Sequence, residues 1–363
     1  MFNLSKIDFL SFDMSLKTNS GFQTNGTNKK YSKLIKRQYM LSKVAKYLVE
    51  HQIELPICLM AVITLAYILK VPGSEKFLFL HENPKTGLYE TSMDDAYFVF
   101  FWIVTFTLLR AATMEYILTP IAKKGRIKKN ARITRFAEQG WSFLYYSVFW
   151  TFGMYLMYHS PYWFDTTYFW KDYPHKELTY SFKAYYLLQF AFWLQQLFVL
   201  NVEKRRKDFV EMATHHVITI LLMFFSYIFN LTRIGNAVLC TMDFADIQLP
   251  LAKMLKYLGF NMICDVLFGI FMVSWLVTRH YIYGCIIYST WNEPRLYIEY
   301  KWAPEEDYYF TENVHRFFLL LFCILQVIII FWFCLISNVA YKVIKGDGAH
   351  DNRSSESERE HED

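Results

Sequence analysis

The sequence predicts an all-α polytopic membrane protein built as a bundle of transmembrane helices. Hydrophobic residues make up 54% of the 363 residues, whereas a typical soluble domain has about 45–50%. Charged residues make up 20%, below the usual share of about 25%, and they gather between long apolar runs. These observations exclude a disordered chain, a fibrous repeat and an ordinary cytosolic enzyme.

Net charge and cysteine content exclude further classes. The net charge of +5 is too small and too dispersed to indicate a nucleic-acid partner. The six cysteines include no CxxC pair, so neither a disulfide framework nor a zinc site is indicated. We expect no signal peptide, because the first long apolar run begins near Ile53, behind a basic polar segment.

Apolar runs of about 20 residues suit helices that cross a bilayer. We predict eight such helices, at residues 53–69, 96–118, 141–159, 182–200, 214–231, 234–258, 262–278 and 314–340. The sixth is the least apolar, since it contains Asp243, Asp246 and Lys253. Its neighbours support it, because the fifth span must turn back around residues 232–235. A count of seven remains the alternative.

Basic residues predict the orientation of the spans. They cluster at residues 36–46, 123–135, 204–207 and 342–345, whereas the alternate loops at 75–95 and 305–312 are acid-rich. Because cytosolic loops carry an excess of Lys and Arg, eight spans with both termini in the cytosol satisfy every loop.

The chain divides by composition into four parts. Residues 1–50 form a basic cytosolic region, residues 51–95 the first span and its loop, residues 96–345 the main membrane domain, and residues 346–363 an acidic tail. Ser355 and Ser357 each have an acidic residue three positions later, which suits an acidophilic kinase. An ordinary solvated tail would have the same composition.

Adjacent histidines enter the fifth predicted span. On a helix the imidazoles of His215 and His216 point about 100° apart. One ring can therefore face a cavity while the other packs against it or orients it. The pattern also suits two histidines that lie at headgroup depth.

Two carboxylates lie within the sixth predicted span. Their spacing of three places Asp243 and Asp246 on one helix face, about 5–6 Å apart at Cβ. At hydrocarbon depth they require a cation, a hydrogen-bond donor or a shared proton. They could instead brace the bundle by bonding Arg233, Lys253 or backbone groups.

The two clusters lie at similar depth if the fifth and sixth spans form a hairpin. Counted from Arg233, His216 lies 17 residues before and Asp246 lies 13 after, so the offset along the axis is about 6 Å. A carboxylate that orients an imidazole is what proton transfer at a buried site requires. Spacing alone does not decide whether the two faces meet. We predict no metal site, because adjacent histidines diverge and no His-xxx-His pair shares a face.

Other polar residues within the spans have weaker patterns. Gln189, Gln195 and Gln196, and Arg110 with Glu115, suit hydrogen bonds between helices. The run Lys204, Arg205, Arg206 and Lys207 could hold a phosphate-bearing substrate. Basic clusters of this kind more commonly stop translocation at the end of a span.

Taken together, these residues resemble the LAG1 ceramide synthase family within the TLC-domain superfamily. The resemblance covers residues 135–340 and includes the blocks RFAEQGWSFLYY at 135–146, YYLLQFAFW at 185–193 and EKRRKDF at 203–209. Its core consists of His215, His216, Thr219, Ser226, Tyr227, Asn230, Arg233, Gly235, Asp243, Asp246, Lys253 and Tyr257. The basic N-terminal region and the extra span resemble the fungal branch.

The resemblance implies an N-acyltransferase of the endoplasmic reticulum membrane. It would condense a sphingoid long-chain base with a long or very-long fatty acyl-CoA, as co-substrate, inside a TLC-type core that encloses a lipid tunnel. His215, His216, Asp243 and Asp246 would carry the chemistry. Tyr227, Asn230 and Arg233, with Lys204–Lys207, would contact substrate. No cofactor is expected; a small single-pass subunit and a homo- or hetero-dimer are possible partners.

A non-catalytic TLC-type protein that binds, senses or transports lipid is the alternative. It would share the bundle but would not require the complete set of two histidines and two aspartates.

Overall fold

The computed structural model describes residues 43–203 and 208–345, so Lys204–Lys207, Ser355 and Ser357 lie outside the described residues. Residues 48–363 form a unit distinct from residues 1–47. The described part of this larger unit is helical and contains no strand, only the isolated bridges Tyr89–Leu178 and Ala303–Tyr308. The all-α prediction is therefore confirmed.

The principal helices match the eight predicted apolar segments. They are α2 (Glu54–Ile68), α4 (Asp95–Ala112) with η1 (Thr113–Leu118) and α5 (Thr119–Lys124), α6 (Asn130–Tyr158), α7 (Tyr180–Val202), α8 (Phe209–Ile228), α9 (Thr232–Tyr257), α10 (Asn261–Trp275) with η3 (Leu276–Ile282) and α11 (Tyr283–Asn292), and α13 (Glu312–Ile344). Short elements are α3 (Glu75–Leu78), η2 (Thr166–Phe169), α12 (Pro294–Tyr297) and η4 (Pro304–Glu306).

Length and composition mark fewer of these helices as membrane spans. Among the described residues, four helices are long and apolar enough: Asp95–Lys124, Phe209–Ile228, Asn261–Asn292 and Glu312–Lys342. A fifth candidate counts helix Lys43–Glu50 and α2 together as one broken span. The protein is thus a multi-pass membrane protein. Helices α6, α7 and α9 carry more polar residues, because they supply the polar interior described below.

Two boundaries differ from prediction. The hairpin between α8 and α9 turns at residues 229–231, where Asn230 adopts φ 55°, and not at 232–235. Gly235 lies inside α9, and a Cβ there would overlap the ring of Tyr186. The seventh helix does not end at Thr278, since the π-helical segment η3 carries it on into α11. Apolar content alone marks neither boundary.

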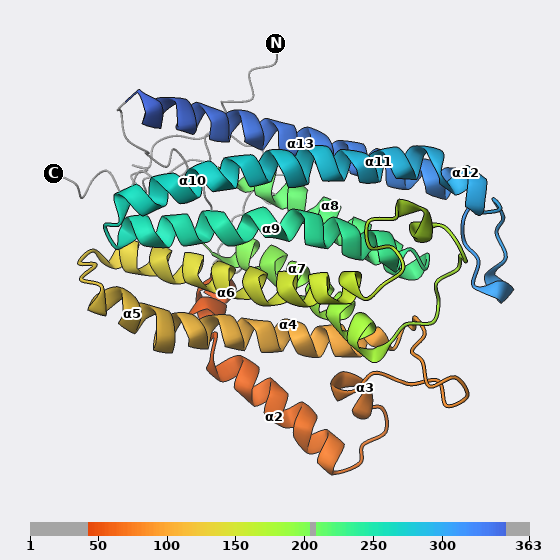
Figure 1. Cartoon of the computed structure of the whole chain (residues 1–363). Coiled ribbons are helices and arrows are strands. Elements are labelled where there is room, and N and C mark those ends of the chain that lie inside the picture. Colours follow the sequence, from red (N-terminus) through yellow and green to blue (C-terminus); the bar gives the residue numbers. More distant parts are fainter. Residues whose placement is uncertain (1–42, 204–207, 346–363) are drawn as a thin grey trace, which may run out of the picture. The chain divides into compact units, whose positions relative to one another are not determined.

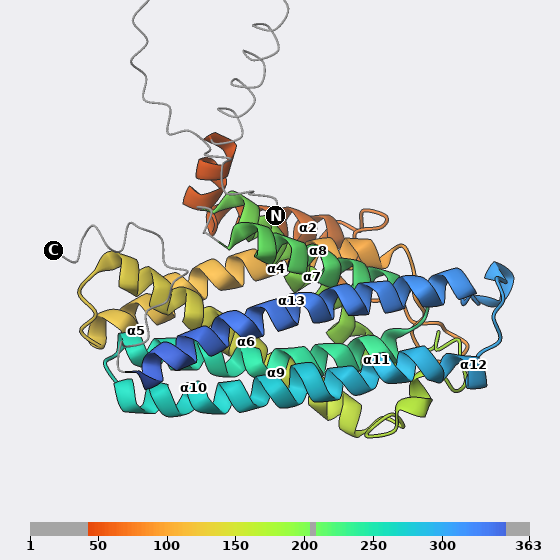
Figure 2. The ribbon, with the colours of Figure 1, turned by 90° about the horizontal axis from the view of Figure 1, so that it is seen from above.

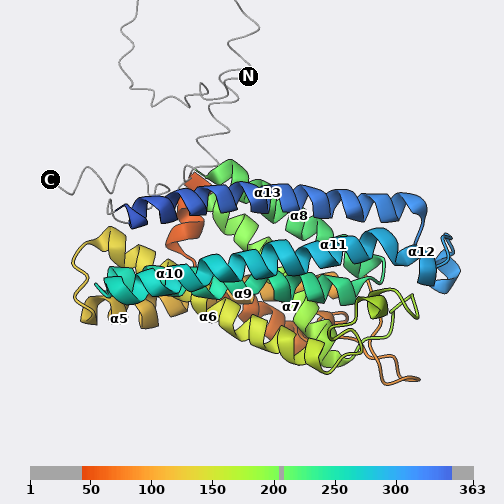
Figure 3. The same ribbon diagram turned by 45° about the horizontal axis from the view of Figure 1, so that its top comes forward.

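Helix α9 lies at the centre of the bundle. It contacts α6, α8 and α10, and in Figure 1 it runs between α6 and α10. Helix α13 packs on α8 and α11, as Figure 2 shows from above. Figure 3 shows α10 and α11 as one long rod beside α9 and α13. Polar side chains on α9 therefore face other helices and not lipid.

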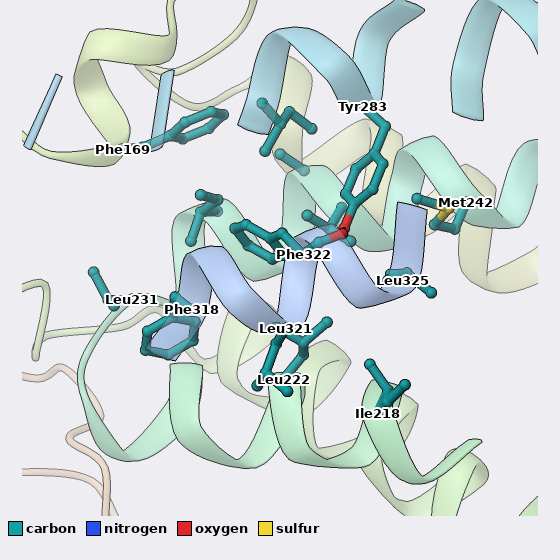
Figure 4. Close-up of a cluster of buried hydrophobic side chains, with 14 of the residues drawn as sticks. Phe169, Ile218, Leu222, Leu231, Met242, Tyr283, Phe318, Leu321, Phe322 and Leu325 are labelled. Atoms are coloured by element: carbon teal, nitrogen blue, oxygen red, sulfur yellow. The ribbon is translucent and has the colours of Figure 1, made fainter. Parts of the chain in front are cut away.

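Two large apolar clusters hold the bundle together. One joins α4, α6 and α7 through rings such as Phe106, Tyr145 and Phe192. The other joins α8, α9, α11 and α13, and Figure 4 shows Ile218 and Leu222 of α8 opposite α13. Removing apolar surface from water contributes about 25 cal/mol per Å². Between helices that already lie in lipid, van der Waals packing of the rings stabilises the association instead.

A buried ion pair fastens α4 to α7 near the α8–α9 turn. The ammonium of Lys183 lies 2.7 Å from Oδ1 of Asp95, and these side chains are 1% and 6% exposed. Lys183 also donates to the carbonyl of Glu90 at 2.7 Å. Oδ2 of Asp95 accepts from the hydroxyl of Tyr227 at 2.6 Å and from the amide of Ser92 at 2.8 Å.

Lys183→Met is expected to lower the free energy of unfolding by about 3–5 kcal/mol, because it leaves the carboxylate of Asp95 buried without a cation. Unfolding followed by circular dichroism in detergent measures it. The matched control is Tyr227→Phe, which removes one hydrogen bond to the same carboxylate and should cost about 1.5–3 kcal/mol. Equal losses in the two variants would contradict a central role for the ion pair.

His175 makes the loop between α6 and α7 sensitive to pH. Its side chain is 5% exposed, and Nε2 donates to the carbonyl of Lys171 at 2.7 Å. Burial, reinforced by the positive charge of Arg233, lowers the pKa of His175 to about 4. In the unfolded chain His175 binds a proton near pH 6.5, so between pH 6.5 and 4 the unfolded state holds more protons than the folded state. The free energy of unfolding therefore decreases as the pH is lowered through this range.

His175→Gln is therefore expected to remove a pH-dependent loss of stability that reaches about 3 kcal/mol below pH 4. The measurement is the difference in free energy of unfolding between the natural and variant proteins at pH 7.5 and at pH 5. That difference should change by about 2 kcal/mol between the two pH values. A difference that stays constant with pH would show that His175 does not titrate as stated.

Candidate active site

The two histidines on α8 have different surroundings. His216 is buried, and its Nδ1 donates to the carbonyl of Met212 one turn earlier at 2.7 Å. The ring of His215 packs edge-on against Trp193 of α7 and Trp332 of α13, with ring centroids 5.4 and 5.1 Å apart. Within the described residues, Nδ1 of His215 is shielded and has no hydrogen-bond partner. His216 is thus bonded to its own helix, whereas His215 keeps a free ring nitrogen.

Asp243 is held by a chain of hydrogen bonds between α6, α7 and α9. It is fully buried, and its Oδ2 accepts from Nε2 of Gln189 at 2.8 Å. The amide of Gln189 also donates to the hydroxyl of Tyr185 and accepts from that of Tyr145. Oδ1 of Asp243 has no partner among the described residues. Gln189 therefore bonds helices together, as predicted, and it does so through a candidate catalytic carboxylate.

Asp246 forms an ion pair with Arg279. The guanidinium Nη2 lies 2.6 Å from Oδ2 of Asp246 and donates to the carbonyl of Met242 at 2.8 Å. The ring of Trp275 lies 4.0 Å beneath the guanidinium carbon. Arg279 belongs to the π-helical segment η3, whose wider turn shifts the faces that follow it. A buried cation beside Asp246 is thus supplied by Arg279 of η3, whereas Asp243 is bonded to the amide of Gln189.

Sequence reasoning missed Arg279, although a signal was present. The helix continues past Thr278 through Arg279 and His280 and returns to apolar residues at 281–288. We predicted that the span ends at Thr278, and this placed Arg279 at the membrane interface. An ionisable residue within a span indicates function by default, so the correct helix length would have identified it.

The described residues show no hydrogen bond between either histidine and either aspartate. The groups nevertheless share one region. The charge of Arg279 lies within electrostatic range of His215, and Tyr146 of α6 lies within range of Asp243, Asp246 and Arg279. Arg279 therefore links the two clusters, because it pairs with Asp246 and its charge reaches His215.

Three other residues with predicted substrate contacts lie at the α8–α9 turn. Tyr227 donates to Asp95, the amide of Asn230 donates to the carbonyl of Asp307 at 3.1 Å, and Arg233 donates to the carbonyl of Tyr168 at 2.9 Å. These bonds fasten the turn to neighbouring loops. Arg110 similarly pairs with Glu203 at 2.7 Å, joining α4 to the end of α7.

Buried polar atoms without protein partners lie on both α7 and α8. Among the described residues they include Nδ1 of His215, Oγ1 of Thr219 one turn later, Nε1 of Trp193, and both amide atoms of Gln195. A buried polar group without a hydrogen bond costs about 1–3 kcal/mol. Native proteins seldom retain several together unless water or a ligand meets them. The chemistry available at His215 is that of a basic ring nitrogen between two indole rings.

Comparison with known proteins identifies the family of the chain. The family described as TRAM_LAG1_CLN8: TLC domain matches residues 135–338, a range that contains every residue of the site. Sphingosine N-acyltransferase lag1 of Schizosaccharomyces pombe is 41% identical over 78% of this chain and 73% of its own length. The chain belongs to the LAG1 ceramide synthase family of TLC-domain proteins.

The chain is also similar to ceramide synthases of another fungus and of an animal. Ceramide synthase LAG1 of Saccharomyces cerevisiae is 34% identical, over 74% of this chain and 66% of its own length. Ceramide synthase 5 of Homo sapiens is 32% identical, over 65% of this chain and 58% of its own length. The resemblance to the family, and to its fungal branch, is thereby confirmed.

Proposed function

We propose that this protein is a ceramide synthase that transfers the acyl group of a long or very-long fatty acyl-CoA to the amine of a sphingoid base. The names of its relatives support this activity. The observation that carries the proposal is the free ring nitrogen of His215, held between two tryptophans. An amine that attacks a thioester must lose a proton, and this nitrogen accepts one.

The reaction balances with one imidazole. The amine nitrogen attacks the thioester carbonyl, the C–N bond forms and the C–S bond breaks. The proton of the amine passes to His215 and then to the CoA thiolate. The same nitrogen can instead take the acyl group first and yield it to the amine. Asp243 and Asp246, the latter through Arg279, balance the charge that forms on the ring.

The two apolar tails require an enclosure that opens to the bilayer. We propose that the protein spans the endoplasmic reticulum membrane eight times, with both termini in the cytosol. The TLC core would enclose a lipid tunnel. The phosphate-bearing CoA moiety would bind beside the basic segments at 123–135 and 204–207. An apolar groove of about 610 Å³ along α10, whose wall includes Phe244 between the two aspartates, supports access from lipid.

Purified full-length protein tests the activity. With a sphingoid base and acyl-CoA, we expect one amide per CoA released, and mass spectrometry of the protein with acyl-CoA alone will detect an acyl-histidine if that route is used. CoA release without amide would indicate a hydrolase. Bound lipid with no turnover would favour the lipid-binding alternative. A tag after Asp363 that sealed microsomes protect from protease would contradict the proposed orientation.

A further inference from the structure

A second polar pair lies at mid-depth between η3 and α13, outside the site already described. Nδ1 of His280 and Nε2 of Gln326 are 3.0 Å apart. The ring of Phe333 lies 5.2 Å from that of His280. Gln326 stands near the middle of α13, a helix of 33 residues. Polar side chains at this depth are costly, so the pair requires an explanation.

Each member of the pair leaves one buried atom unsatisfied. Within the described residues, Nε2 of His280 and Oε1 of Gln326 are shielded and have no hydrogen-bond partner. Because Gln326 donates to Nδ1, the proton of the neutral ring is on Nε2, which is therefore an unused donor. Oε1 of Gln326 is an unused acceptor.

This conclusion does not depend on the orientation of the amide. If the amide of Gln326 is rotated by 180°, its oxygen accepts from Nδ1, its NH₂ group becomes the unused donor, and Nε2 of His280 becomes the unused acceptor. Either arrangement presents one donor and one acceptor. A bond made only to join the helices would not explain why a donor and an acceptor both remain buried without partners.

We propose that His280 and Gln326 bind a hydroxyl group of the sphingoid base. The inference rests on the proposed function, since it assigns a subsite for one of its substrates. A hydroxyl both donates and accepts, so its chemistry matches one unused donor and one unused acceptor. The thioester carbonyl only accepts, and the attacking amine must keep its lone pair free. The highly charged CoA head is excluded from the apolar interior.

The position of the pair suits a substrate that lies against the first site. Trp332 of α13 contacts the ring of His215, and Gln326 lies six residues earlier, about 9 Å along the helix axis. His280 directly follows Arg279, which pairs with Asp246. An amine near His215 and a hydroxyl near His280 would place the base across this part of the bundle.

The test compares a 2-amino-1,3-diol base with analogues that lack the 1-hydroxyl or the 3-hydroxyl. His280→Phe and Gln326→Leu are each assayed in purified full-length protein. For the diol, kcat/KM should fall at least tenfold in either variant, as expected when a polar substrate group loses a built partner. For one of the two deoxy analogues, kcat/KM should change less than twofold, and KM for acyl-CoA should not change. That analogue identifies the hydroxyl.

Two controls separate recognition from packing. Phe333→Leu alters the same apolar contact without a polar group and should affect all three bases equally. His280→Gln, which keeps a donor and an acceptor, should restore part of the preference for the diol.

Equal losses for all three bases in both variants would overturn the subsite while leaving the proposed function intact. If the natural protein forms no amide with any base, the proposed function fails and this inference fails with it.

Discussion

His215→Ala is expected to lower kcat for ceramide formation at least 100-fold, the largest effect of any single substitution in the bundle. A positioned general base contributes about 10²–10⁴ to a rate, and a nucleophilic imidazole would be no easier to replace. Nδ1 of His215 has no protein partner among the described residues. Its removal therefore breaks no hydrogen bond there, and the folded yield should remain close to that of the natural protein. Steady-state kinetics in detergent, with ceramide measured by mass spectrometry, check this result.

The neighbouring histidine provides the matched control. His216→Ala removes a buried ring and its hydrogen bond to Met212, so we expect a lower unfolding temperature and a smaller loss of kcat. Both variants must be compared at a temperature where both remain folded. If His216→Ala loses more turnover than His215→Ala, the two roles are exchanged.

The fold was predictable because its principal signals are local. Apolar runs separated by basic or acidic loops marked all eight principal helices, and charged residues inside those runs marked the region of the site. The hairpin of α8 and α9 could also be counted along its axis, since a helix has a fixed rise per residue. These inferences depend on composition and spacing alone.

The partners of each polar group were not predictable in the same way. Spacing placed the histidines and aspartates at similar depth, but Asp243 bonds to Gln189 and Asp246 pairs with Arg279. Those contacts depend on which faces meet across α7, α9 and η3. The π-helical turn that carries Arg279 depends on tertiary packing, and no hydrophobic periodicity records it. A single missed helix extension therefore concealed the cation that pairs with Asp246.

Asp246→Asn is expected to lower kcat more than tenfold, and adding Arg279→Gln is expected to recover part of that loss. In the single variant the guanidinium of Arg279 keeps its charge within electrostatic range of His215 but loses its carboxylate. At an effective dielectric constant of about 20, two unit charges about 4 Å apart interact by about 4 kcal/mol, and this energy falls in inverse proportion to their distance. The charge of Arg279 opposes the imidazolium that forms during proton transfer, so the rate falls. The double variant lacks this charge, so the imidazolium forms more readily and part of the rate returns.

A purely structural ion pair predicts a different pattern. Breaking a buried pair by removing one partner costs about 3–5 kcal/mol of stability, and Asp246→Asn would then lose active protein in proportion to its unfolded fraction. The decisive quantity is kcat per folded molecule, with the folded fraction measured by size-exclusion chromatography and thermal unfolding. If Asp246→Asn retains the natural kcat on this basis, Asp246 only braces η3 against α9. If the double variant is slower than Asp246→Asn, Arg279 assists the reaction directly, by stabilising the oxyanion that develops on the thioester carbonyl.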